Sequence, residues 1–338
     1  MTGAIPAEWP YGAAFWQRLG RSIMDVILHL GAHRTATTTF QHYMRDHSDD
    51  LASKQIAFWG PERVRGSVTP GLFRRSTAPK GRNLAKRAEG RIRLFAAQAK
   101  AQGIKQLLVS DENLLGNCKQ NIRAERLYPA AGERIARVSA AFGGQVRRIV
   151  LTIRAQDLWW ASACALTVSR GHPVPSTTRL ANIAHSRRNW RDVITDLACA
   201  APGAQIDVLT FEAGAGGCER VLRAALETDV PTDTRKRWLN RSPDLQSLRA
   251  ALAEQGSDPE LLPDTLGRWQ PFTAEQTAML RENYADDLHW LFAGAEGLAT
   301  LTEDTCPNRA ETYLPSGAFT KGQRDDQGQI EGHVAQHR

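Results

Sequence analysis

The chain has 338 residues, of which 42% are hydrophobic and 23% charged, and its formal net charge at pH 7 is +7. This composition is typical of a globular protein with a large core, and it argues against extensive disorder. The five cysteines are odd in number, widely spaced and without a CxxC pair, which argues against a disulfide scaffold or a zinc site. The basic residues are spread over many segments, which favours a cleft for an anionic ligand over nucleic-acid binding.

Residues 1–23 are interpreted as a leader that lacks the apolar core of a secretion signal, and no apolar stretch is long enough to span a membrane. The expected location is therefore the cytoplasm. Residues 24–300 are expected to form one domain, with a helical C-terminal part from about residue 231. Residues 301–338 are expected to form a polar tail, for which the alternatives are a mobile lid and a disordered segment.

The first structural element in the chain is predicted at residues 25–30 (DVILHL), a compact apolar run that ends at Gly31. Four further strands are predicted at residues 55–60, 106–110, 146–153 and 206–211. Helices are predicted between them at residues 37–51, 81–101, 129–142, 155–168, 187–200 and 217–227. From about residue 231 the pattern becomes mainly helical, with the clearest segments at 245–255 and 273–292. Strands that alternate with helices predict an α/β fold with a parallel sheet flanked by helices.

Residues 28–40 (LHLGAHRTATTTF) join the first strand to the first helix through Gly31 and a run of threonines. Such a turn presents backbone N–H groups and the positive end of a helix to phosphate. When the segment is aligned with the Walker A pattern GxxxxGK[ST], Thr37 occupies the position of the lysine. This argues against an ordinary ATP-binding loop. The alternative is a plain strand-to-helix connection in which the threonines cap the helix.

A second motif, VLTIRAQDLWWAS at residues 150–162, places Arg154 at the end of a predicted strand and Ser162 inside the following helix. A forked cation and a hydroxyl one to two helical turns away can converge on one phosphate. An exposed arginine with no ligand is the alternative.

Between these motifs, residues 107–115 (LLVSDENLL) place Asp111 and Glu112 at the carboxyl end of a strand, where open α/β sheets bind ligands. A carboxylate there is a candidate general base, with Glu112 the first choice and Asp111 the second. The alternative is that either acid caps the next helix or pairs with an arginine.

The segment GAHRTATTTFQ resembles the loop of P-loop sulfotransferases, which commonly runs GxPKTGTT, and Arg154 with Ser162 resembles that family's second phosphate-binding motif. The resemblance implies a P-loop NTPase-like fold and transfer of a sulfuryl group from 3′-phosphoadenosine 5′-phosphosulfate to a hydroxyl or amine of a glycan or small molecule, with no metal required. It implies catalytic roles for Arg34 and Glu112, and contacts with the donor from His33, Arg34, Thr35, Ala36, Thr37, Thr38, Arg154, Ser162 and Lys321.

Two departures from the family pattern are His33 for proline and Ala36 for glycine, where a Cβ can hinder the phosphate. The alternatives left open are a P-loop nucleotide kinase and a non-catalytic nucleotide- or glycan-binding protein of the same fold. The acceptor and the oligomeric state carry no signal in the sequence.

The segment from residue 158 to residue 190 is rich in tryptophan, histidine and arginine, and is a candidate wall for the acceptor. Core packing is the favoured interpretation for its tryptophans. Phe211 and Glu212, after the last predicted strand, resemble the family's common strand-end acid, and the resemblance implies a structural task for Glu212.

Overall fold

The structure is a computed structural model that describes residues 24–73, 83–214, 217–226 and 239–302. The predicted leader lies outside the described residues, as does the predicted tail from residue 303 onward with Lys321. No helix in the described ranges is both long enough and apolar enough to cross a membrane.

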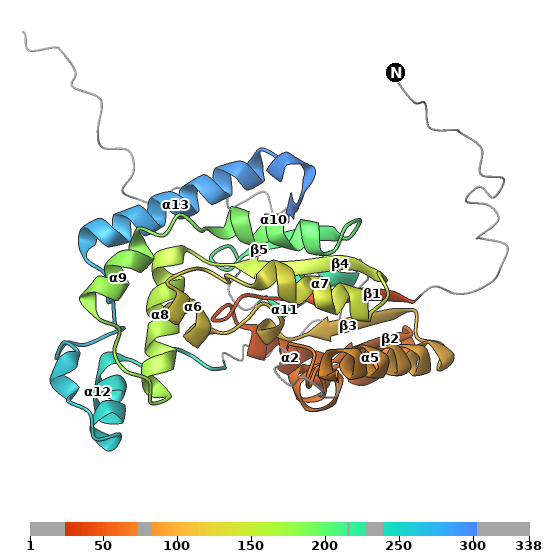
Figure 1. Ribbon diagram of the computed structural model, residues 1–338, viewed down its shortest axis with the longest axis horizontal. Coiled ribbons are helices and arrows are strands. Elements are labelled where there is room, and N and C mark those ends of the chain that lie inside the picture. Colours follow the sequence, from red (N-terminus) through yellow and green to blue (C-terminus); the bar gives the residue numbers. More distant parts are fainter. Residues whose placement is uncertain (1–23, 74–82, 215–216, 227–238, 303–338) are drawn as a thin grey trace, which may run out of the picture. The chain divides into compact units, whose positions relative to one another are not determined.

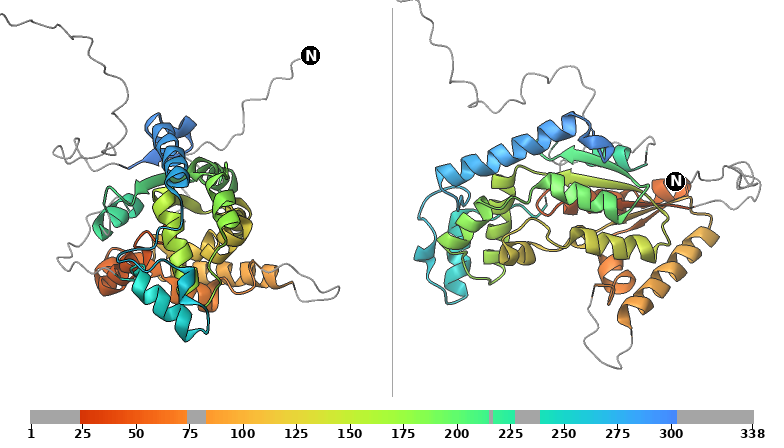
Figure 2. Two further views of the ribbon diagram at one scale, coloured as in Figure 1. Left: turned by 90° about the vertical axis from the view of Figure 1, so that its left-hand side faces the viewer. Right: turned by 45° about the horizontal axis from the view of Figure 1, so that its top comes forward.

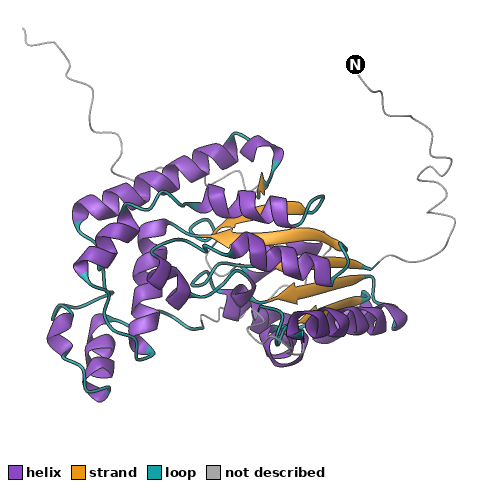
Figure 3. Ribbon diagram, in the orientation of Figure 1, coloured by secondary structure: helices purple, strands orange, loops and turns teal. Residues whose placement is uncertain are grey.

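The described residues contain one sheet of six parallel strands (Figures 1 and 3). The order across the sheet is β2-β3-β1-β4-β5-β6. The strands are β1 (Asp25–His29), β2 (Ile56–Trp59), β3 (Gln106–Ser110), β4 (Val146–Ile153), β5 (Gln205–Thr210) and β6 (Thr300–Leu301). The predictions of an α/β fold, a parallel sheet and its first five strands are confirmed, whereas the two-residue β6 was not foreseen.

Helices cover both faces of this sheet, which is why its strands are continuous apolar runs. On one face, Val26 and Leu28 of β1 join a large core with helices α5 (Leu84–Ala101), α7 (Ala131–Ala141) and α10 (Trp190–Ala200). On the other face, Ile27 joins a smaller core with α2 (Thr37–Asp46), α3 (Ser48–Ser53) and α11 (Cys218–Leu226).

Five further helices lie toward the end of the sheet at which the strand arrows point, or along its edge (Figures 1 and 2). They are α6 (Cys118–Ala124), α8 (Gln156–Ser169), α9 (Thr177–Ala184), α12 (Leu245–Glu254) and α13 (Ala274–Phe292). Three tryptophans of the candidate acceptor wall, Trp159, Trp160 and Trp190, are at most 1% exposed. They belong to the large core, so the favoured interpretation of core packing is confirmed.

Most predicted helices lie within three residues of their observed bounds, but the helix predicted at 37–51 is wrong as a single element. His47 separates α2 from α3 with a φ of −111°, and its ring Nδ1 lies 2.9 Å from the carbonyl oxygen of Tyr43. Asp49 and Asp50 then lie in the first turn of α3, where carboxylates stabilise a new helix N-terminus.

The remaining differences between the predicted and the observed elements are short elements that were not predicted. They contain too few residues to produce a periodic pattern in the sequence. Besides α6 and α9, these are α4 (Pro61–Arg63), the π-helical turn η1 (Val64–Val68), and the 3₁₀ turns η2 (Glu112–Leu114), η3 (Pro259–Leu261) and η4 (Ala295–Gly297).

The strand order creates a crevice at the carboxyl ends of β1 and β3. The chain leaves β1 toward β2 on one side, whereas after β3 it crosses to β4 on the other side of β1. The two connections therefore run in opposite directions, and ligands of open α/β sheets bind beside adjacent strands whose connections do so. The loop that contains His33 and the segment that contains Asp111 and Glu112 both start there.

Candidate anion-binding site

The loop between β1 and α2 curls tightly because two residues other than glycine adopt the left-handed conformation, Arg34 with φ 68° and Ala36 with φ 61°. The Thr35 hydroxyl donates to the Ala32 carbonyl at 2.6 Å, and the Thr37 hydroxyl donates to the Gly31 carbonyl at 3.2 Å. The threonine hydroxyls thus hold the loop together from inside.

Gly31 is required by close packing under this loop. A Cβ at Gly31 would lie 2.9 Å from Nε2 of His29 and 3.0 Å from the Thr37 hydroxyl oxygen. His29 is itself fully buried, and burial lowers its pKa to about 4, so its imidazole is neutral at pH 7. No larger residue fits without moving the loop or this ring.

The N-terminus of α2 has no side-chain cap, since Ala36 occupies the N-cap position. The first helical hydrogen bond runs from the Phe40 N–H to the Ala36 carbonyl at 3.1 Å. The N–H groups of Thr37, Thr38 and Thr39 come before this bond, so they take no part in the hydrogen bonds within the helix. No acid lies in the first turn. The alternative that the threonines cap the helix is therefore wrong, and the positive helix end is directed at the crevice.

The two predicted phosphate-binding motifs meet at Arg34. Its Nε donates to the Ser162 hydroxyl of α8 at 2.8 Å, and its Nη2 donates to the Ser242 hydroxyl at 2.9 Å. Ser162 is 5% exposed and lies behind the Arg34 side chain. A group that comes to Ser162 from the crevice therefore meets the Arg34 guanidinium first.

Arg154 fixes the same loop from the end of β4. Its Nη1 donates to the carbonyl oxygen of Arg34 at 3.0 Å, and its guanidinium carbon lies 4.9 Å from the Phe211 ring centroid. The side chain is 8% exposed, and its Nε has no hydrogen-bond partner among the described residues. Burial lowers its pKa. This N–H donor is therefore open to an acceptor that the described residues do not supply.

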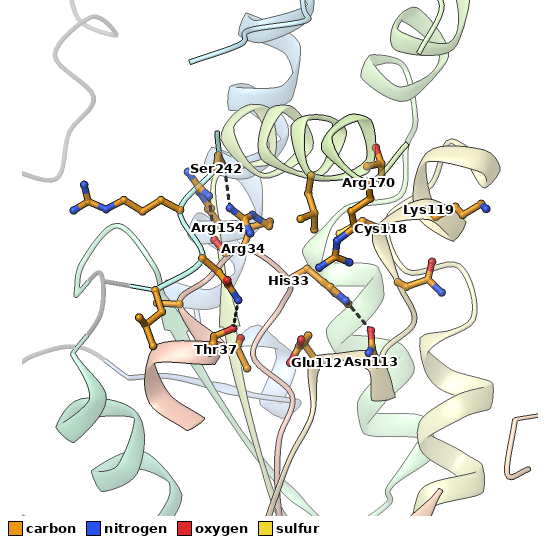
Figure 4. Close-up of a pocket in the computed structure, with 18 of the residues that line it drawn as sticks. His33, Arg34, Thr37, Glu112, Asn113, Cys118, Lys119, Arg154, Arg170 and Ser242 are labelled. Carbon is orange, nitrogen blue, oxygen red and sulfur yellow. Dashed lines mark hydrogen bonds between the residues drawn. The ribbon is translucent and has the colours of Figure 1, made fainter. Parts of the chain in front are cut away.

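These residues border a cavity of about 340 Å³ between the loop, α6, α8 and a segment that precedes α12 (Figure 4). It is lined by His33, Arg34, Ala36, Thr37, Thr38, Arg65, Glu112, Asn113, Asn117, Cys118, Lys119, Arg154, Leu166, Thr167, Arg170, His172, Phe211, Leu239, Asn240, Arg241, Ser242 and Arg268. All the residues predicted to contact the donor, and the first-choice base Glu112, line this cavity except Thr35, Ser162 and Lys321. Thr35 supports the loop, Ser162 lies behind Arg34, and Lys321 is not described.

The charges around this cavity are strongly unbalanced. Among the described residues that line it, Glu112 is the only acid. Within the described part of the chain no carboxylate pairs with five of the lining cations, Arg34, Lys119, Arg154, Arg170 and Arg268. Burial and the neighbouring Arg154 and Arg170 lower the pKa of Arg34, since each makes a further positive charge less favourable. The described lining of the cavity is therefore strongly electropositive.

Asp111 and Glu112 have different environments although they are adjacent. Asp111 is 1% exposed, accepts from the Asn113 N–H at 2.9 Å and pairs with Arg65 at 2.6 Å. Asp111 therefore has the structural role that the alternative interpretation assigned to it. Glu112 faces the cavity, where its Oε1 pairs with Arg65 at 2.9 Å and its Oε2 accepts from Gln41 at 3.2 Å.

Glu112 is ionised at neutral pH. Burial alone would raise its pKa, but the Arg65 guanidinium and the hydrogen bonds to the carboxylate outweigh burial and hold the pKa below its ordinary value. Oε2 has the single donor Gln41 among the described groups, so it retains a lone pair for a proton or a ligand donor.

His33, the departure from the family's proline, belongs to a second network. Its Nδ1 lies 2.8 Å from the Tyr128 hydroxyl and its Nε2 3.1 Å from the Asn113 amide. The amide is satisfied when its oxygen accepts from Arg65 at 3.0 Å and its nitrogen donates to Nε2. In that arrangement the imidazole proton lies on Nδ1. Burial lowers the pKa of His33, so the ring is neutral at pH 7.

Other candidates for the acceptor wall divide into two groups. Arg170 and His172 line the cavity. Arg179 instead pairs with Glu125, and Arg188 pairs with Asp196, so both have structural partners. The prediction of a structural task for Glu212 agrees with its contacts, because it accepts from the Ala155 N–H and from the Tyr284 hydroxyl, both at 2.9 Å.

Several cavity residues were not identified in the sequence. Arg65 lies in the π-helical turn η1, a rare element that often marks a functional site. Ser242 and Arg268 come from the C-terminal third, and Asn240 of the same segment donates to the Thr38 hydroxyl at 2.9 Å. The only available signal was the basic run around residues 63–93, which does not single out Arg65.

Comparison with protein-family models, curated proteins and solved structures found no match to this chain in any of the three. Among the described residues, no group of three or more His, Cys, Asp or Glu side chains is placed to hold a metal ion.

Proposed function

We propose that this chain is a sulfotransferase that moves a sulfuryl group from 3′-phosphoadenosine 5′-phosphosulfate to a hydroxyl or amine of a glycan or small molecule. The observation that carries the proposal is the meeting of Arg34 and Arg154 beside Ser162, at the uncapped N-terminus of α2. Arg34 and Arg154 belong to motifs 120 residues apart. Both motifs resemble the phosphate-binding segments of one family, which supports a donor with two phosphate ends.

The residues present fit such a donor. The buried Arg154 Nε lacks an acceptor among the described groups, and an unsatisfied donor of this kind costs about 1–3 kcal/mol. A 3′-phosphate bound by Arg154 and Ser162 would remove that cost. Because Ser162 lies behind the Arg34 side chain, binding requires Arg34 to turn toward the 5′ end of the donor.

At the 5′ end, the N–H groups of Thr37 and Thr38 and the positive end of α2 would bind the 5′-phosphate. Arg34 would stabilise the charge that grows on the leaving phosphate. Arg65 is already paired with Asp111 and Glu112, so it positions the acids rather than binding the donor.

The donor supplies an activated sulfuryl group. Glu112 is the proposed proton acceptor, because it is ionised, lines the cavity and keeps Oε2 accessible to a ligand. As the acceptor oxygen bonds to sulfur and the bond to the bridging oxygen breaks, the acceptor proton passes to Glu112. Asp111 is excluded from this role by its burial and its two partners.

A thermal-shift comparison tests donor binding. We expect 3′-phosphoadenosine 5′-phosphate in the presence of EDTA to stabilise the protein, by about 2.7 kcal/mol at a concentration of 100 Kd. A preference for ATP with magnesium would instead support the nucleotide-kinase alternative. Catalysis is then measured as transfer of labelled sulfate to a panel of hydroxyl and amine acceptors, with Glu112→Ala as the inactive comparison. Donor binding with no transfer to any acceptor would favour a non-catalytic binding protein.

A further inference from the structure

A short segment before α12, residues 239–242, lies against the first turn of α2 and forms a strap beside the phosphate loop. The N–H of Leu239 donates to the Thr39 hydroxyl at 3.2 Å, and the side-chain amide of Asn240 donates to the Thr38 hydroxyl at 2.9 Å. Thr38 is one of the residues proposed to bind the donor. The strap therefore contacts the surface on which the donor is proposed to bind.

The strap also reaches the place where the two phosphate-binding motifs meet. The Ser242 hydroxyl oxygen accepts from Arg34 Nη2 at 2.9 Å and lies 2.5 Å from the Ser162 hydroxyl oxygen (Figure 4). An arginine N–H and a serine hydroxyl are the neighbours that a phosphate oxygen takes in a binding site. Ser242 thus places a neutral hydroxyl at a position that suits a phosphate oxygen.

The strap and Arg34 hold each other in this closed arrangement. Arg34 donates through Nε to Ser162 and through Nη2 to Ser242, so its guanidinium bridges the two serines. The 2.5 Å between the two serine oxygens leaves no space for a ligand atom between them. The turn of Arg34 toward the 5′ end, which donor binding requires, therefore removes a hydrogen bond from the strap as well as from Ser162.

Few interactions hold the strap in place. No backbone-to-backbone hydrogen bond joins residues 239–242 to another described residue. Asn240 is exposed with a left-handed φ of 53°, and Leu239 and Ser242 are half-buried. Of the four hydrogen bonds to the strap, three join neutral groups, and such bonds are roughly half as strong as those to an ionised phosphate. A phosphate would also compensate the charge of Arg34, which the Ser242 hydroxyl does not.

We infer that the strap closes the phosphate subsite in the free protein and that the nucleotide displaces it. The inference rests on the proposed function and adds a regulation of the same site. The measured affinity is then the affinity of the open form reduced by the fraction of molecules that are open. A change that weakens the strap tightens nucleotide binding, whereas a strap that stays closed and adds its own hydrogen bonds to the nucleotide predicts the opposite.

The first test is the Kd of 3′-phosphoadenosine 5′-phosphate, measured by calorimetry without metal in wild type and in Asn240→Gly/Ser242→Ala. The double variant removes three of the four hydrogen bonds, and glycine keeps the left-handed conformation at residue 240 accessible. The Kd is expected to fall by about threefold or more. The matched control is Ser257→Ala, which removes a hydroxyl from an exposed position outside the cavity and should leave the Kd unchanged.

Hydrogen exchange at the Leu239 amide tests displacement in wild type, without relying on a variant. The hydrogen bond of this amide to Thr39 is lost when the strap leaves α2, so saturation with the nucleotide should speed its exchange by about fivefold or more. A Kd that rises or stays the same in the double variant overturns the inference. So does a Leu239 amide whose exchange is unchanged or slower with nucleotide bound.

Inorganic pyrophosphate separates failure of the inference from failure of the proposed function, because it carries the phosphate charge without the nucleoside. If pyrophosphate binds the double variant about threefold or more tightly than wild type and speeds Leu239 exchange, while the nucleotide binds neither protein, the strap is supported and the proposed donor is wrong. If neither ligand binds either protein, the inference and the proposed function are both wrong.

Discussion

Ala36 occupies a left-handed position, with φ 61°, that is suited to glycine. For a residue with a Cβ this conformation costs roughly 1–2 kcal/mol. Glycine removes that cost but increases the entropy of the unfolded chain, which offsets about 0.5–1 kcal/mol. We therefore expect Ala36→Gly to raise the free energy of unfolding by about 0.5–1 kcal/mol, and the melting temperature by about 1–3 °C.

The same substitution is expected to tighten nucleotide binding, because it removes a Cβ from the cavity lining next to the N–H groups of α2. Urea unfolding followed by circular dichroism measures the stability, and titration calorimetry measures the affinity for 3′-phosphoadenosine 5′-phosphate.

The matched control is Ala253→Gly, an exposed position inside α12 where glycine should destabilise by roughly 0.5–1 kcal/mol. If Ala36→Gly destabilises the protein as much as this control does, the strained loop geometry is refuted.

Three further predictions concern residues around the site and in the core. Gly31→Ala is expected to destabilise by about 1–3 kcal/mol, measured by urea unfolding, because its Cβ would clash with His29 and Thr37. Glu112→Gln is expected to lower kcat by roughly 100-fold or more without changing nucleotide affinity. Burial raises the pKa of Asp287 from 3.8 to about 6, so this residue stabilises the fold below pH 4 and loses that contribution as pH rises through 6. Relative to wild type, the free energy of unfolding of Asp287→Asn should therefore increase by about 2 kcal/mol between pH 4 and pH 7.

Each of these predictions has an outcome that would contradict it. A fully stable Gly31→Ala protein would mean that the loop does not pack on His29 as described. Unchanged turnover in Glu112→Gln would transfer the role of base to another group. Parallel pH profiles for wild type and Asp287→Asn would show that the Asp287 carboxyl titrates normally in the folded protein.

The strands and the loop were predictable because their signals are local. Each central strand is a short apolar run buried on both faces, and Gly31 followed by threonines marks the turn after β1. The break at His47 escaped prediction because the apolar pattern continues through Leu51. The end of α2 is seen only in the structure, in the φ of −111° at His47 and in the contact of its ring Nδ1 with the Tyr43 carbonyl oxygen.

The rest of the site depends on contacts between residues far apart in the chain. Arg65 meets Asp111 across 46 residues, and Ser242 meets Arg34 across 208. Charge composition alone cannot decide which of many arginines points into a cavity. The family resemblance identified Arg154 and Ser162, but not that Arg34 lies between Ser162 and the cavity.

The central claim is that Arg154 and the loop together bind a nucleotide with a 3′-phosphate. Its most direct test is the ratio of the Kd of ADP to that of 3′-phosphoadenosine 5′-phosphate, measured by calorimetry without metal in wild type, Arg154→Gln and the control Arg187→Gln. Loss of a charged hydrogen bond of about 1.5–3 kcal/mol corresponds to a change of roughly 10- to 150-fold. We predict a ratio of at least ten in wild type and Arg187→Gln that collapses toward one in Arg154→Gln, whereas equal affinities in wild type, or a ratio unchanged in Arg154→Gln, would contradict the account.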